Sequence, residues 1–160
     1  MQEVRGMREF ERSFYEDTEI ESARFFRKDL AEKVGGYEED VVFYEESTLP
    51  QKIEKLGHDV KLRVNSYILH NEPDFNLMSW LRKKYYYAKT LEFYSSKYKD
   101  YASRQVSISY RYSLFFKNEN WKRFMSKPLL ALSTLLLKSL EFMMLGIGYL
   151  NRKIWGKNAR

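Results

Sequence analysis

The side chains best suited to chemistry are a pair of carboxylates and a histidine. Glu45 and Glu46 stand side by side just before an expected helix, and His70 ends an expected strand, with Glu72 close behind it. A carboxylate in such a place can take a proton as a general base, and an imidazole can bind a divalent metal or contact a phosphate. Structural roles also fit these residues. The carboxylates suit the positive end of a helix dipole, and His70 suits a hydrogen bond at the start of a loop.

A short helix is expected before the carboxylates. Asp29 and Glu32 form a variant of the capping box, and the Gly35-Gly36 pair supplies residues that adopt the left-handed conformation at the end of a helix. Residues 37–43 then form a loop that leads toward the carboxylate pair.

A second helix is expected over residues 48–56, directly after the carboxylates. Thr48 can cap its start and Gly57 can end it. The helical spacing places Ile53 and Leu56 toward the core.

Two strands are expected around these helices, because apolar residues alternate with polar ones over 20–28 and over 60–68. The second strand would place His70 where strand gives way to loop.

Three more segments favour helix. Residues 7–17 carry Phe10 and Phe14 four apart, and residues 76–101 carry a long amphipathic pattern. Residues 103–116 alternate as a strand would, but we expect a helix there because of the helices on both sides.

The most apolar segment, residues 128–150, contains Lys138 and Glu141 three apart, where they can pair on one helix face. As a helix its 23 residues would extend about 34 Å, slightly more than the roughly 30 Å hydrocarbon core of a bilayer. The two charges disfavour burial at a bilayer centre. We therefore favour a helix lying in the membrane interface, with a spanning helix and a helix packed on protein as alternatives.

Composition narrows the class of protein. The chain has 160 residues, no Cys, 44% hydrophobic residues and 17% aromatic residues, which indicates one folded unit without disulfides or thiolate metal sites. Residues 121–160 carry eight Lys or Arg against one acid, so the basic character lies in the tail. Nucleic-acid binding is disfavoured because these basic residues accompany a long apolar run. No phosphate-binding glycine loop or Ser/His/Asp pattern is present, and the start of the chain has no secretory signal.

Residues 20–72 carry a resemblance to a known family. The run ESARFFRKDLAEKVGGYEEDVVFYEESTLPQKIEKLGHDVKLRVNSYILHNE resembles the second half of family 2 glycosyltransferases of the GT-A fold. The following RKKYYYAKTLEFY resembles the basic, tyrosine-rich helix found after this core in membrane-associated members. The resemblance implies a partial GT-A, Rossmann-like α/β half-domain followed by long amphipathic and hydrophobic helices.

The resemblance also implies roles for individual residues. Glu46 stands at the position of the family's catalytic base, usually Asp, and Glu45 matches the Glu before it. Gly35, Gly36 and Tyr37 match the turn that borders the acceptor site, and Lys52 matches a basic position beyond the carboxylates. His70 matches a histidine that helps bind the metal or the diphosphate.

The resemblance begins close to Met1, so the family's nucleotide-binding half and its Asp-x-Asp metal motif have no counterpart in the chain. It thus implies a separate N-terminal half that binds the nucleotide-sugar donor and Mg²⁺ or Mn²⁺, without which this chain is inactive. We expect residues 1–75 to be the acceptor-side half-domain, 76–120 an amphipathic helical segment and 121–160 a membrane-associating helix.

The expected function is sugar transfer to a lipid-linked or polysaccharide acceptor at the cytoplasmic face of the membrane, with no nucleic acid as partner. The alternative is a non-catalytic membrane-associated adaptor or assembly module derived from such an enzyme.

Overall fold

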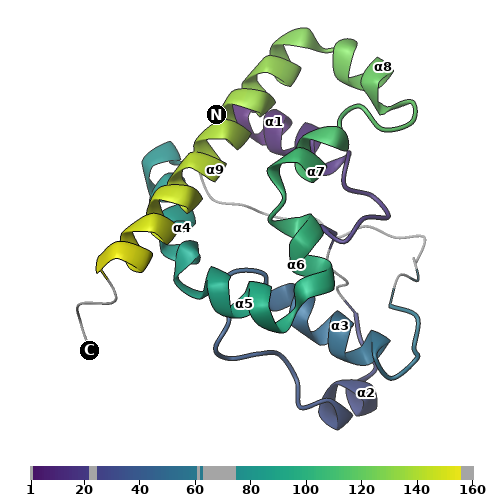
Figure 1. Ribbon diagram of the computed structural model, residues 1–160. Coiled ribbons are helices and arrows are strands. Elements are labelled where there is room, and N and C mark those ends of the chain that lie inside the picture. Colours follow the sequence, from purple (N-terminus) through teal and green to yellow (C-terminus); the bar gives the residue numbers. More distant parts are fainter. Residues whose placement is uncertain (1, 22–24, 61, 63–74, 156–160) are drawn as a thin grey trace.

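The computed structural model describes residues 2–21, 25–60, 62 and 75–155, and within these ranges the regular structure is helical (Figure 1). The elements in chain order are α1 (Gln2–Arg12), α2 (Lys28–Lys33), the 3₁₀ helix η1 (Glu45–Ser47), α3 (Thr48–Glu54), α4 (Leu77–Tyr87), the 3₁₀ helix η2 (Ala88–Thr90), α5 (Leu91–Lys97), α6 (Lys99–Gln105), α7 (Ile108–Ser113), α8 (Asn120–Met125) and α9 (Pro128–Trp155).

The expected α/β half-domain is therefore wrong, because the described ranges contain no strand and no sheet. Residues 25–27 are irregular and Lys28 already begins α2, so the alternation over 20–28 does not correspond to a strand there. Most of the second expected strand, over 60–68, lies outside the described residues. In the first expected strand, Phe25 is 75% exposed and Phe26 contacts the Tyr37 ring, so neither side chain packs as part of a sheet.

Helix α9 is the longest element and runs along one edge of the molecule, with α2 and α3 at the far side (Figure 1). Its inner face packs on α1, α4, η2 and α8. Pro128 begins it, at the one helical position where the missing N–H is harmless. Its length and apolarity are those of a helix able to cross a membrane, which is weak evidence by itself.

Helices α9 and α4 come very close together at Gly148. Gly148 is buried, and a Cβ atom at this position would lie 2.5 Å from the carbonyl oxygen of Tyr85 and 2.9 Å from the Cβ of Ala88. Glycine allows two helix backbones to come this near because it has no side chain. The contact fixes the height and rotation of α9 against α4.

Two aromatic clusters form the core. One joins α1 to the segment around α8, and its rings include Phe10, Phe14, Phe115 and Phe124, with Phe14 and Phe115 in edge-to-face contact at 5.3 Å. The other gathers Val41, Phe43, Tyr44, Ala88, Tyr94, Tyr98, Ala102 and Leu145. Tyr94 and Phe115 are fully inaccessible to solvent, as expected for the centres of packed cores.

Several expected helix ends are confirmed. Gly35 and Gly36 have φ values of 74° and 69° just after α2, and Gly57 has a φ of 84° three residues after α3. The Gly36 N–H donates to the Ala31 carbonyl at 2.9 Å, which closes the end of α2. Within the region of α3, Ile53 is buried as expected.

Other boundaries differ from the expectation. Leu56 is 43% exposed and does not face the core, because α3 ends at Glu54. The long helix expected over 76–101 is divided into α4, η2, α5 and the start of α6. The chain changes direction at these breaks, which lets Tyr94 and Tyr98 turn inward.

Candidate functional site

The carboxylate pair lies at the start of a continuous turn of helix. Glu45 and Glu46 begin η1, which runs directly into α3, and both side chains are exposed. Tyr44 precedes them with a φ of 65°, the left-handed conformation that a bulky side chain rarely adopts. Such a conformation costs about 1–3 kcal/mol and persists only where surrounding contacts enforce it. The backbone that presents the carboxylates is thus held in one particular shape.

A buried polar network lies beneath the carboxylates and supplies those contacts. The Gln105 amide nitrogen donates to the Ser47 hydroxyl at 2.8 Å, and its side-chain oxygen accepts a hydrogen bond from the Tyr94 hydroxyl at 2.5 Å. Gln51 donates to the Ser47 carbonyl and to the Tyr94 hydroxyl, each at 3.0 Å. The network joins η1 and α3 to α5 and α6.

Arg111 completes the support of Tyr44. Its guanidinium donates to the Tyr44 hydroxyl at 2.7 Å and to the Gln105 backbone carbonyl at 2.8 Å, and the Tyr44 hydroxyl donates to that carbonyl at 2.8 Å. Burial raises the pKa of Tyr44 above its ordinary value, so the hydroxyl keeps its proton. The left-handed residue is therefore held both by its backbone neighbours and by its own side chain.

The glycine turn and the predicted basic residue meet at the other end of α3. The Lys52 ammonium donates to the Gly36 carbonyl at 2.9 Å and lies 3.7 Å from the Glu38 carboxylate. The Thr48 hydroxyl accepts from the Glu38 N–H at 3.1 Å and donates to the Glu45 carbonyl at 2.8 Å. The turn, Lys52 and the backbone of Glu45 thus form one hydrogen-bonded unit.

Glu38 anchors this unit to α5 and α6. Its carboxylate accepts from Lys97 at 2.6 Å and from the Tyr98 hydroxyl at 2.9 Å. These hydrogen bonds, the one from Lys97 first, hold the pKa of Glu38 below its ordinary value. Tyr37, the next predicted acceptor-side residue, is about half exposed and packs its ring edge against Phe26.

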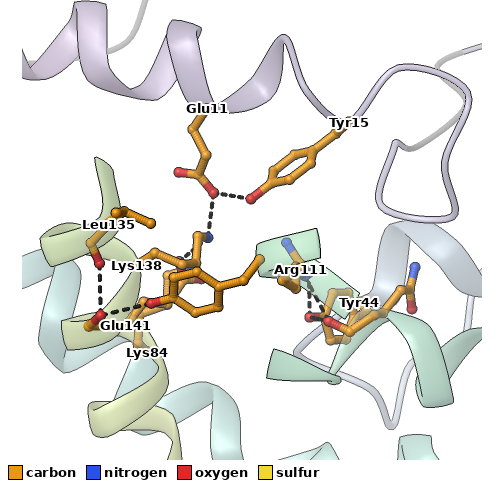
Figure 2. Close-up of polar contacts among 11 residues, drawn as sticks. Glu11, Tyr15, Tyr44, Lys84, Arg111, Leu135, Lys138 and Glu141 are labelled. Atoms are coloured by element: carbon orange, nitrogen blue, oxygen red, sulfur yellow. Dashed lines mark hydrogen bonds and ion pairs between the residues drawn. The ribbon is translucent and has the colours of Figure 1, made fainter. Parts of the chain in front are cut away.

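A second polar cluster lies within the helical packing around α9 (Figure 2). The Lys138 ammonium pairs with Glu141 at 2.5 Å, as its spacing predicted, and with Glu11 of α1. Glu141 also pairs with Lys84 of α4 at 2.5 Å, and the Tyr15 hydroxyl donates to Glu11. The cluster ties α9 to α1 and α4.

Burial and ion pairing have opposite effects on the pKa values of the side chains in this cluster. Burial acts to raise the pKa of Glu141, but the neighbouring Lys138 and Lys84 outweigh it and hold that pKa well below its ordinary value. Burial also acts to lower the pKa of Lys138, and the two nearby carboxylates reverse the effect. At neutral pH Lys138 and Glu141 are therefore both charged and compensate each other.

His70, the predicted metal-site residue, lies outside the described residues, as does Glu72. Elsewhere in the described part of the chain, no three His, Asp or Glu residues come close enough together to hold a metal ion. None of the described side chains is therefore assigned the role of a metal ligand.

Sequence reasoning did not identify the residues that support the carboxylates. Gln105, Tyr94 and Arg111 contact the Glu45 segment from more than forty positions along the chain, with no local pattern to reveal the contact. A weak signal existed for Lys84, a charged residue on the apolar side of the expected helix, since such a residue usually needs a buried partner.

No family model matches the chain, and no curated protein or solved structure shows significant similarity to it.

Proposed function

We propose that the chain is the acceptor-side part of a sugar transferase that acts on a lipid-linked or polysaccharide acceptor at the cytoplasmic face of a membrane. A separate part would bind the nucleotide-sugar donor and its divalent metal. The observation that carries the proposal is the exposed Glu45-Glu46 pair, which the left-handed Tyr44 and the buried Gln105 network hold in a fixed place.

Three features support this assignment over a simple solvated helix end. A helix end needs no strained residue in front of it, whereas strained residues cluster at functional sites. Lys52 donates a hydrogen bond to Gly36, and the Thr48 hydroxyl links the Glu45 carbonyl to the Glu38 N–H, so the residues that resemble acceptor-side residues of family 2 glycosyltransferases lie in one hydrogen-bonded unit. Both carboxylates also remain open to solvent, so an acceptor hydroxyl can reach them.

The proposed chemistry is a single displacement with inversion. Glu46 takes the proton of the acceptor hydroxyl as that oxygen attacks the anomeric carbon of the donor sugar, and the nucleoside diphosphate leaves with the electrons of the broken bond. The Gly36–Lys52 turn borders the acceptor.

The test uses the chain together with its donor-binding part and follows transfer from a panel of nucleotide sugars to polyprenyl-phosphate-linked acceptors. Loss of a general base typically costs about 10²- to 10⁴-fold in rate, so Glu46→Gln should lower turnover to that extent. Glu92→Gln is the matched control, because Glu92 is an exposed glutamate on α5. Unchanged turnover in Glu46→Gln would refute the assignment of the base.

The second candidate is a non-catalytic membrane-associated module. The observation that favours it is the exposed apolar face of α9, which suits association with a membrane and requires no catalysis. The two functions differ in a binding experiment, because a ligand of the folded state must raise its melting temperature. A shift with a lipid-linked sugar acceptor supports transfer, whereas no shift with any acceptor or nucleotide sugar supports the module.

A further inference from the structure

The outer face of α9 is an uninterrupted apolar stripe. Leu129, Leu132, Leu136, Met143, Leu150 and Ile154 are each more than half exposed. Their spacings of three, four and seven residues place them on one side of the helix, and Leu140 and Ile147 fill the gap. At 1.5 Å per residue the stripe is about 38 Å long. Contiguous apolar patches of this kind on a soluble surface mark interaction sites.

The two charged side chains in the middle of α9 face the opposite way. Lys138 and Glu141 are 3% and 7% exposed and pair with α1 and α4, and Thr134 is buried one turn earlier. Ala131, Leu137 and Leu145 are buried on the same inner side, so α9 is apolar on both its inner and its outer face. A helix that packs on one side of a soluble protein normally has a polar outer face. The outer face of α9 is instead lipid-like, while the charged groups that would resist a bilayer are paired within the protein.

The ends of the stripe differ from its middle. An exposed tryptophan lies on either side of the stripe along the chain: Trp121 is on α8, the helix before α9, and Trp155 ends α9, and they are 48% and 70% exposed. Lys127 precedes α9 and Lys153 lies in its last turn, and both are exposed. Exposed tryptophans and basic residues around an apolar centre match the headgroup and hydrocarbon layers of one bilayer leaflet.

We propose that α9 lies flat on the membrane, with the stripe in the outer hydrocarbon of one leaflet and Lys127 and Lys153 at anionic phospholipid headgroups. A spanning orientation is disfavoured by the pairing of Lys138 and Glu141 with Glu11 and Lys84, because both carboxylate–ammonium contacts would have to enter the hydrocarbon together with α1 and α4. We choose a lipid surface rather than a protein as the partner of the stripe, because the basic residues at both of its ends suit anionic headgroups. This docking face does not depend on sugar transfer.

The test measures flotation of the full chain with vesicles of phosphatidylcholine containing phosphatidylserine. Leu136→Glu and Leu150→Glu place a charge in the stripe and should abolish flotation. Leu56→Glu is the matched control. Leu56 is also an exposed leucine, and it follows α3, a helix that lies far from α9 (Figure 1). All three sites are exposed, and unchanged far-ultraviolet circular dichroism verifies that the variants fold.

The charge component is tested with Lys127→Gln and Lys153→Gln, each of which should weaken binding to the anionic vesicles about fivefold. Vesicles of phosphatidylcholine alone should bind the wild type more weakly. The proposal is overturned by absence of flotation, by an equal loss in Leu56→Glu, or by a stable dimer in sedimentation velocity that Leu136→Glu converts to monomer. Resistance of the bound chain to alkaline carbonate extraction would overturn the flat orientation in favour of a spanning one.

Discussion

Two glycines of α9 should respond in opposite ways to the same substitution. Gly146 is exposed, and a methyl group added there would have no atom of the described residues within 4 Å. A methyl group added at Gly148 would meet the Tyr85 carbonyl at 2.5 Å and Ala88 at 2.9 Å. Both are interior helical positions, where alanine is favoured over glycine by about 0.5–1 kcal/mol. Gly146→Ala should therefore stabilise the protein by about that amount.

Gly148→Ala gives the same gain in helix propensity as Gly146→Ala, but it also has a steric cost. The Tyr85 carbonyl belongs to the backbone of α4 and cannot rotate away, so α9 must move off α4. Overpacking of this kind costs about 1–3 kcal/mol, occasionally more. The difference in unfolding free energy between Gly148→Ala and Gly146→Ala isolates that cost, because the helix propensity term is common to both.

Urea unfolding followed by circular dichroism measures both variants, and thermal melting provides a second reading. For a chain of this length 1 kcal/mol corresponds to about 2–4 °C in Tm. We expect Gly146→Ala to melt above the wild type and Gly148→Ala to melt below Gly146→Ala by several degrees. Equal stabilisation in the two variants would refute the α4–α9 contact and with it the orientation of α9.

Other predictions concern the buried charges and Tyr44. Lys138→Met leaves the Glu11 and Glu141 carboxylates short of a partner and should cost about 3–5 kcal/mol, whereas the exposed Lys127→Met should change stability by less than about 0.5 kcal/mol; equal effects would contradict the buried pairing. Tyr44→Phe removes the hydroxyl that accepts from Arg111 and should cost about 1–3 kcal/mol in urea unfolding, and a neutral result would exclude that hydrogen bond. The pKa values of Glu38 and Glu141 lie below their unfolded values, so their stabilisation is complete above about pH 5 and is lost as pH falls through the folded values. The urea concentration at the midpoint of unfolding should therefore decrease as the pH is lowered from about 5 to about 3. A midpoint that stays constant over this range would contradict this linkage.

Local signals in the sequence predicted local structure well. The Gly35-Gly36 pair and Gly57 follow their helices with positive φ, because few other residues adopt the left-handed conformation without cost. The Lys138–Glu141 pair followed directly from a spacing of three on a helix. The partners Glu11 and Lys84 could not be predicted, since they reach α9 from other helices through tertiary packing.

The α/β expectation was wrong because short alternation is a weak signal. The pattern around 20–28 rests on few residues, and aromatic side chains are favoured in strands and in packed helical cores alike. Of the aromatics in that segment, Phe25 is 75% exposed and Phe26 contacts Tyr37. Periodicity could not distinguish the two environments.

The candidate site was predicted in part. The sequence identified Gly36, Lys52 and Glu45, and the structure joins them through Thr48 and Lys52. It gave no indication of the left-handed Tyr44, because tyrosine has no preference for that conformation and only the surrounding network enforces it. Catalysis by Glu46 and metal binding by His70 remain predictions.

The orientation of α9 at the membrane is tested most directly with spin labels. The chain has no native cysteine, so single cysteines at Leu132, Leu136, Met143 and Leu150 can each be labelled uniquely. On anionic vesicles we expect all four labels to be accessible to oxygen and shielded from a water-soluble nickel complex. All four should lie at the same depth in the bilayer. A control label at Asn151 should remain in water. A depth that is greatest at the middle of the helix and shallow at both ends would contradict the flat orientation, as would four labels exposed to water.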